Sequence, residues 1–227
     1  MTPRPAAPAA PAATPTRVEL AFYGFCRGAV VGFCRLFWRL GVEGREHVPD
    51  GPFVLAPVHR SNIDTPLVGA VTRRRLRYMG KDTMWKYRAS GWLFSALGGF
   101  GVNRAAADRD ALRRCEQVLA GGEPLVLFPE GSRQSGAVVQ PLKDGPAWLA
   151  IRGGVPIVPV GIGGSERAMP KGARFLRPVR VHIVIGPPIY PPPGGAGGRL
   201  TARRQLTGQL RQELQRLFDE AQRRAGA

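Results

Sequence analysis

The chain has 227 residues, an apolar content of 44% and a formal net charge of +17, from 33 Lys and Arg against 16 Asp and Glu. This length suits one domain with its own core, and the apolar content excludes a multi-span membrane protein. The charge indicates an anionic partner, and because neither zinc-finger spacing nor an aromatic RNA-binding motif is present, we expect lipid or a phosphorylated substrate rather than nucleic acid. Three cysteines without metal-ligand spacing predict buried thiols in a reducing compartment and no metal site.

The N-terminal region divides into two parts of different composition. Residues 1–16 are rich in Pro and Ala without the apolar core of a signal peptide, so we expect a disordered tail. Residues 17–42 are dense in Leu, Phe and Val but contain Arg27 and Arg35. An arginine at the centre of a bilayer costs about 2.5–3.5 kcal/mol, which favours an amphipathic helix in the membrane interface over a spanning helix. A helix packed on the domain's own core is the alternative.

Residues 43–190 alternate between short apolar runs and helical patterns. The predicted strands are residues 52–58, 76–80, 100–103, 125–128, 156–162 and 179–185, and the predicted helices are residues 61–73, 83–97, 105–119 and 145–152. This alternation predicts an α/β fold, a single domain with a mainly parallel, mixed sheet flanked by helices. In such sheets, functional residues collect in the loops beyond the carboxyl ends of the strands.

Residues 191–227 complete the chain with a Pro/Gly-rich connector and an amphipathic helix, predicted over residues 201–224. Leu206, Leu210, Leu214 and Leu217 recur at helical spacing among many arginines. We expect this helix to pack on the domain, with lipid binding as the alternative.

The first chemical motif, HRSNID, occupies residues 59–64 directly after the first predicted strand. Histidine is suited to take a proton from a hydroxyl because its pKa lies near working pH, and a carboxylate can hold its ring. If His59 lies at the strand end and Asp64 in the first helical turn, the two side chains can meet. The alternative is a capping box from Ser61 to Asp64, in which Asp64 only closes the helix N-terminus.

The second motif, LVLFPEGSR, occupies residues 125–133. Gly131 permits close approach of the backbone to a ligand, and the planar guanidinium of Arg133 matches a phosphate. The alternative is that Glu130 and Arg133 only pair across a surface turn.

The two motifs together, in this order and about 70 residues apart, resemble the H-x-x-x-x-D and F-P-E-G-T-R hallmarks of the lysophosphatidic acid acyltransferase family. This family belongs to the glycerolipid acyltransferase superfamily. Residues 99–104 and 155–160 resemble its second and fourth blocks, so the resemblance covers roughly residues 40–190. The chain departs from the pattern at Val58, where many members carry Asn, and at Ser132, where Thr is usual.

The resemblance implies a role for each matched residue. His59 would be the general base and Asp64 its orienting partner. Val155 and Pro156 would shape the acyl-binding side. The residues implied to hold the glycerol-phosphate part of the acceptor are Arg104, Glu130, Gly131, Ser132 and Arg133. Lys143 is a further candidate for phosphate contact, although a solvated helix start would explain it equally well.

The resemblance also implies an activity. The chain would transfer a fatty acyl chain from acyl-CoA or acyl-carrier protein to the free hydroxyl of lysophosphatidate, forming phosphatidate in phospholipid biosynthesis. Transfer would be direct, without an acyl-enzyme, since no Ser or Cys sits in a nucleophile-elbow setting. We also expect the mechanism to need no metal or cofactor. We expect a peripheral or monotopic protein bound to anionic lipids at the cytoplasmic face of the cell membrane. The alternatives are a different lysolipid acceptor and a non-catalytic, basic lipid-binding module.

Overall fold

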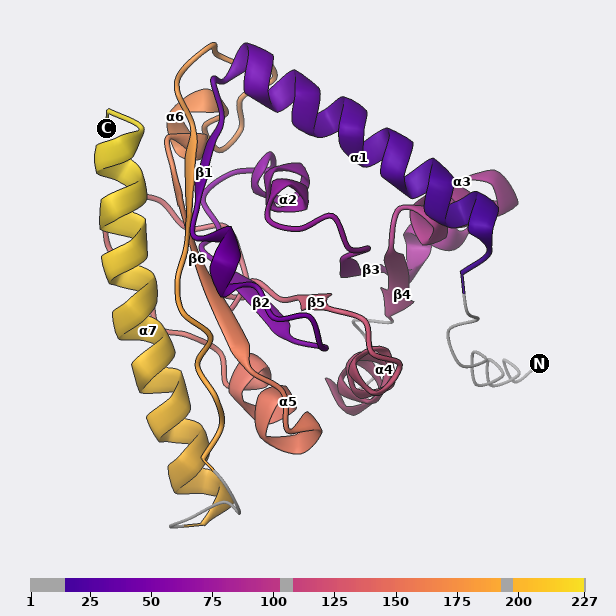
Figure 1. Cartoon of the computed structure of the whole chain (residues 1–227), viewed down its shortest axis with the longest axis vertical. Helices are drawn as coiled ribbons and strands as arrows, with labels where there is room; N and C mark the ends of the chain where they lie inside the picture. The colour runs from indigo at the N-terminus through magenta and orange to yellow at the C-terminus, as the bar shows by residue number, and fades with distance from the viewer. Residues whose placement is uncertain (1–14, 103–107, 193–197, 227) are drawn as a thin grey trace, which may run out of the picture.

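A computed structural model describes residues 15–102, 108–192 and 198–226 (Figure 1). They form an α/β domain around one seven-stranded sheet with the order β1-β7-β6-β2-β5-β3-β4. The strands are β1 (Gly41–Glu43), β2 (Val54–Pro57), β3 (Arg77–Lys81), β4 (Gly99–Val102), β5 (Leu125–Val126), β6 (Ile157–Gly163) and β7 (His182–Ile185). The helices are α1 (Arg17–Phe37), α2 (Asp64–Leu67), α3 (Arg88–Ala96), α4 (Asp108–Ala120), α5 (Gly145–Gly153), α6 (Ser165–Ala168) and α7 (Arg199–Arg224). The predicted fold class is confirmed.

The strand pairing places the two sequence motifs at one edge of the sheet. β2 lies at the centre and pairs in parallel with both β5 and β6. Val54 lies opposite Leu125, so the loops that follow β2 and β5 leave the sheet side by side. The only antiparallel pair of the described sheet is β6 with β7, which makes the sheet mixed. Parallel strands thus bring residues that are distant in sequence to a common carboxyl edge.

The helix α7 covers one face of the sheet, along β6, whereas α2 and α4 lie on the other side (Figure 1). Its leucines at positions 206, 210, 214 and 217 are buried, so packing on the domain is confirmed for this face. The approach is close because Gly161 and Gly163 of β6 have no side chain: a Cβ at either position would overlap the carbonyl oxygens of Leu217 and Ala221.

The helix α1 has two different faces. It begins with a capping box between Thr16 and Glu19, and its inner face buries Tyr23, Val31 and Cys34 against the domain. Its outer face exposes apolar side chains, with Phe25 and Leu36 exposed by 75% and 86%. By length and composition alone, α1 is the one helix of the described residues that could cross a membrane. The core-packed alternative therefore holds for the inner face, and the interfacial interpretation stays a prediction for the outer face.

Two predicted helices are interrupted in the structure. The helix expected over residues 61–73 begins only at Asp64 and passes after Leu67 into a 3₁₀ turn, Val68–Ala70. The carboxylate of Asp64 binds the backbone N–H groups of Arg60 and Ser61, which holds these residues in a loop. The helix expected over residues 83–97 divides into a 3₁₀ turn, Asp82–Trp85, and α3.

The short strand β1 escaped the sequence analysis. It straddles the expected boundary at residue 43 and pairs in parallel with β7. A 3₁₀ turn, Arg45–His47, follows it. Three residues are too few for a period-2 pattern, so no signal marked this strand.

Candidate active site

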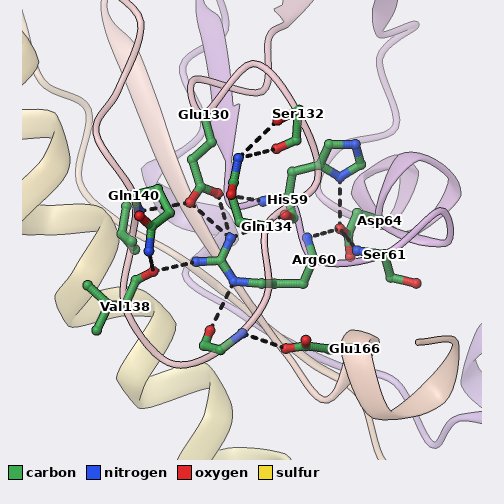
Figure 2. Close-up of polar contacts among 12 residues, drawn as sticks. His59, Arg60, Ser61, Asp64, Glu130, Ser132, Gln134, Val138, Gln140 and Glu166 are labelled. Carbon is green, nitrogen blue, oxygen red and sulfur yellow. Dashed lines mark hydrogen bonds and ion pairs between the residues drawn. The ribbon is translucent and has the colours of Figure 1, made fainter. Parts of the chain in front are cut away.

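A fixed His–carboxylate pair lies at the carboxyl end of β2. Nδ1 of His59 is 3.0 Å from Oδ2 of Asp64. The same carboxylate oxygen accepts hydrogen bonds from the backbone N–H groups of Arg60 and Ser61, both at 2.6 Å. Asp64 is fully buried, whereas 17% of the His59 side chain is exposed. Asp64 therefore fixes the ring with Nδ1–H as donor, and Nε2 points away from the carboxylate (Figure 2).

The capping-box alternative describes only part of what Asp64 does. Its carboxylate accepts from the backbone N–H of Ser61, as the acidic residue of a capping box does, but the N-cap residue of α2 is Ile63 and the same oxygen also contacts Nδ1 of His59. The Ser61 hydroxyl instead donates to the carbonyl oxygen of Met169 at 2.7 Å, which attaches the loop after α6 to the histidine loop.

The second motif supports the histidine ring. Phe128 follows β5, and its ring stacks on the imidazole of His59 with the ring centroids 4.0 Å apart. Because Asp64 holds one edge of the imidazole and Phe128 covers one face, the ring has a defined orientation toward the pocket that it lines.

Glu130 and Arg60 form a buried ion pair beneath the histidine (Figure 2). Nη1 of Arg60 donates to both carboxylate oxygens, at 2.9 and 2.7 Å. The same oxygens also accept from the backbone N–H groups of His59 and Gln140. The expectation that Glu130 holds the acceptor is therefore corrected: its oxygens are occupied by the protein, and it joins the two motif loops.

Arg60 was missed by the sequence analysis although it stands within the first motif. It is 1% exposed, and its remaining guanidinium N–H groups donate to the carbonyl oxygens of Gly136 and Val138. Its guanidinium carbon lies 4.7 Å from the ring centroid of Phe218 in α7. An arginine next to a buried strand is a weak signal for such a role, because most arginines are exposed.

His59 lines a polar pocket of about 470 Å³ together with Gly131, Ser132, Arg133 and Lys171. Gly131 has a positive φ of 75°, and the aliphatic chain of Lys143 lies beside it. Lys143 itself is not among the pocket-lining residues. Arg133 and Lys171 both place a positive charge in the pocket that contains the histidine, so the pocket suits an anionic ligand.

Lys171 was also missed by the sequence analysis. It occupies a turn in which the N–H of Ala173 donates to the carbonyl of Pro170 at 3.0 Å, and Gly172 has the positive φ that a type II turn requires. The contact from Ser61 to Met169 holds this turn near the histidine loop. No signal in the sequence connects Lys171 with a motif 112 residues before it, because only the fold brings them together.

An apolar cavity of about 940 Å³ adjoins the polar pocket, since Met79 lines both. Its walls come from α1, the start of α2, β3, α3 and the β4 region, and include Tyr23, Val30, Trp85 and Phe94. This cavity has the size and lining expected for an extended apolar ligand.

One expected pair of site residues lies elsewhere. Val155 and Pro156 precede β6, at the opposite edge of the sheet from His59, and neither lines the apolar cavity. Their expected place on the acyl-binding side is corrected, because β6 runs parallel to β2 and its amino end is distant from the end that carries His59. Arg104 lies outside the described residues.

Residues 39–163 match the model of a family described as Acyltransferase. The chain belongs to the acyltransferase family. The matched range contains both motifs and excludes Lys171 and α7. The family predicted from the motifs is thereby confirmed.

Curated proteins of the family resemble the chain to different extents. A 1-acyl-sn-glycerol-3-phosphate acyltransferase of Bacillus subtilis is 26% identical over 203 residues, which cover 87% of this chain and 99% of that protein. A chloroplastic protein of the same name from Brassica napus is 28% identical over 68% of this chain and 46% of its own length. One from Chlamydomonas reinhardtii is 30% identical over 78% of this chain and 55% of its own length. The chain thus spans about half the length of these plant and algal relatives.

A solved structure shares the fold. It is the 1-acyl-sn-glycerophosphate (LPA) acyltransferase from Thermotoga maritima, with a TM-score of 0.63 and 24% identity. The match covers 88% of this chain and 87% of that structure, so the acyltransferase fold extends over nearly the whole chain.

Proposed function

We propose that this acyltransferase moves a fatty acyl chain from the thioester of acyl-CoA or acyl-carrier protein to the free hydroxyl of lysophosphatidate, which gives phosphatidate. One observation carries the proposal. A base-bearing pocket with two cationic side chains, Arg133 and Lys171, adjoins a large apolar cavity. An acceptor with a phosphate and a hydroxyl, reacting with a long acyl chain, requires this combination of neighbouring environments.

The proposed chemistry needs one base. Nε2 of His59 takes the proton of the acceptor hydroxyl as its oxygen attacks the thioester carbonyl. The C–O bond forms, the C–S bond breaks, and the thiolate leaves with a proton from the imidazolium. Asp64 stabilises the imidazolium and keeps Nδ1 protonated through the 3.0 Å contact.

The acceptor phosphate lies with Arg133 and Lys171 in this proposal. The guanidinium of Arg133 offers a planar pair of donors, and the ammonium of Lys171 adds a point charge from the loop after α6. Gly131, with its positive φ, leaves the loop backbone open to a ligand. The acyl chain occupies the apolar cavity.

The outer face of α1 supports the proposed location. Its exposed Phe and Leu side chains and the net charge of +17 suit a peripheral or monotopic protein on the anionic, cytoplasmic face of the cell membrane. Such a position would give the apolar cavity, which α1 helps to line, direct access to lipid.

The test is an acyl-transfer assay with lysophosphatidate and a long-chain acyl donor, supplied as acyl-CoA in one arm and as acyl-carrier protein in the other. A panel of lysolipids without a phosphomonoester serves as the acceptor control. We expect turnover of lysophosphatidate and a loss of roughly 10²–10⁴-fold in a folded His59→Ala variant. Asp64→Asn should also be inactive, because an amide cannot stabilise an imidazolium. No turnover of any lysolipid, or near wild-type turnover by His59→Ala, would overturn the proposal.

A further inference from the structure

Four arginines converge in a second pocket, beside α1 and separate from the histidine. The pocket has a volume of about 350 Å³ and is lined by Arg27, Arg35, Arg45 and Arg73, with Gly28, Gly32 and Thr72 among its other residues. No Asp or Glu lines it. Among the ion pairs of the described residues, none involves any of the four arginines.

Two of these arginines are held in place by backbone carbonyl groups. Nε of Arg27 donates to the carbonyl oxygens of Gly69 and Thr72, at 2.8 and 2.7 Å. Nε and Nη2 of Arg45 both donate to the carbonyl oxygen of Ala70. One short turn thus fixes two guanidinium groups, which reduces the conformational entropy that ligand binding would cost.

The other two arginines are exposed, and the four charges repel one another. Among the described residues, the guanidinium groups of Arg35 and Arg73 donate no hydrogen bond, in contrast to those of Arg27 and Arg45. Burial lowers the pKa of Arg45, and the neighbouring charges of Arg35, Arg27 and Arg73 lower it further. Such a group of like charges, held together without a carboxylate, is stabilised by a bound anion.

The position of the pocket on α1 distinguishes it from the acceptor site. Gly28, Gly32 and Arg35 line it from one flank of the helix, whereas Cys26, Ala29 and Val30 line the apolar cavity from the opposite flank. Arg27 and Val31 lie between the two and line both, so the arginine pocket adjoins the apolar cavity but not the pocket of His59. Nothing lies within 4 Å of a Cβ placed at Gly28 or Gly32, so this flank is open. The exposed Phe25 and Leu36 lie between the two flanks, on the outer face.

We infer that this arginine pocket binds the headgroup phosphate of an anionic glycerophospholipid in the membrane on which α1 lies. The phosphate would contact the guanidinium groups, and the acyl chains of the lipid would lie along the outer face of α1. The site deepens the proposed membrane location and does not depend on the acyl-transfer chemistry. Its ligand is a resident lipid of the leaflet, distinct from the acceptor near His59.

The test compares two charge-matched double variants of the full chain. The site variant is Arg35→Gln with Arg73→Gln, and the control is Arg17→Gln with Arg39→Gln, at the two ends of α1. All four positions are exposed, so both variants remove two charges near the same surface without uncovering the core. Binding is measured by cosedimentation with phosphatidylcholine vesicles that contain phosphatidylglycerol, or oleate at equal surface potential, which supplies negative charge without phosphate.

We expect the site variant to lose about tenfold or more in binding to phosphatidylglycerol vesicles, since it loses the phosphate contacts of the pocket in addition to two charges near an anionic surface. The control should lose clearly less, and the difference between the variants should vanish on oleate vesicles. Arg35→Lys with Arg73→Lys should retain part of the binding, because it keeps charge but not the planar donors. Turnover of detergent-dispersed lysophosphatidate should be unchanged, so a failure of the proposed activity would be distinguished from a failure of this site.

Two results would overturn the inference. Equal losses in the site and control variants would mean that diffuse charge, not a pocket, attracts the membrane. Saturable binding of inorganic phosphate without vesicles, abolished in the site variant, together with vesicle binding equal to the control, would assign the pocket to a free anion instead of a lipid.

Discussion

Glu130 shows how a single residue joins the two motif loops. Its carboxylate binds the guanidinium of Arg60 and the backbone N–H of His59, in a region where both side chains are essentially buried. Glu130→Gln removes the negative charge and leaves Arg60 buried without a counter-charge. We expect the free energy of unfolding to fall by about 3–5 kcal/mol. Urea unfolding measures this, with Glu213→Gln as control: its pair with Arg216 is exposed, so that change should be within about 0.5 kcal/mol. If both variants changed the free energy of unfolding by the same small amount, a structural role for the buried pair would be contradicted.

The cations of the polar pocket offer a second test at the residue scale. Lys171→Gln and Arg133→Lys should each raise the KM for lysophosphatidate while the KM for the thioester stays nearly constant, because both side chains line the pocket assigned to the acceptor. Lys143→Gln is the matched control, since Lys143 lies beside Gly131 without lining the pocket. Steady-state kinetics with each substrate varied in turn measures the effect. A change confined to the thioester KM would reverse the assignment of the two substrates.

The site residues differ in how far the sequence could predict them. The meeting of His59 and Asp64 was predictable, because a strand end followed by a helical turn can bring two residues at this spacing together. The hydrogen-bond partners of Glu130 could not be predicted, because nothing in the sequence indicates that Arg60 is buried. The position of Lys171 in the pocket could not be predicted either, because it depends on a turn that only the fold brings close to His59. The assignment of Val155 and Pro156 failed because order along the chain does not say which edge of the sheet a residue occupies.

At the scale of elements, the pair β1 and β7 carries a pH-dependent contribution to stability. The ring of His182 is buried against Gly41, with Nε2 3.1 Å from Oε1 of Glu43, and Arg180 and Arg224 also face it. Burial lowers the pKa of His182 below its ordinary value, although Glu43 opposes the shift. The unfolded chain therefore binds a proton more readily than the folded one, so this contribution is present above about pH 6.5 and is lost as the pH falls.

His182→Gln tests this linkage. Urea unfolding of wild type should show a free energy of unfolding that decreases from about pH 7.5 to about pH 5.5, and the variant should show a smaller decrease. The comparison of slopes separates His182 from the other two histidines, which both chains retain. An identical slope in the variant would remove His182 as the source.

The sequence predicted correctly whether an element is a helix or a strand where its hydrophobic pattern was long enough. The strand at β6 and the helix α7 were expected within a few residues, because buried apolar runs and leucines at helical spacing are strong signals. The helix after His59 was expected too long, since Asp64 draws the preceding backbone into a loop by hydrogen bonds that no periodicity reveals. The start and end of an element thus depend on side-chain contacts, while its type depends on pattern.

At the scale of the whole molecule, α1 is both part of the core and a candidate membrane contact. Trp38, which follows the helix, is buried and donates from Nε1 to the carbonyl of Arg177. Deleting residues 1–40 would therefore uncover the core as well as remove the outer face. A sharper change is Phe25→Ser with Leu36→Ser, which alters only exposed side chains.

This double variant should keep the wild-type Tm and lose about tenfold or more in its partition onto anionic vesicles, because apolar burial in the interface is lost. The control is Tyr190→Ser with Leu200→Ser, two exposed positions. Leu200 belongs to the first turn of α7, which lies away from α1 (Figure 1). Raising salt should weaken wild-type binding without eliminating it, since only the electrostatic part is screened. Unchanged partition of the double variant would place the membrane contact on another surface.

The close packing of α7 on the glycines of β6 also sets an order of events while the ribosome makes the protein. All seven residues of β6 are buried in the finished domain, yet the helix that covers Gly161 and Gly163 follows the strand in the chain and emerges after it. The ring of Phe218 over Arg60 arrives with the same helix. Because nascent domains fold as their segments emerge, the layer beneath the histidine loop closes only when α7 has left the exit tunnel. Until then the face of β6 that α7 covers stays exposed, and the loop of His59 lacks the contact from Phe218 to Arg60.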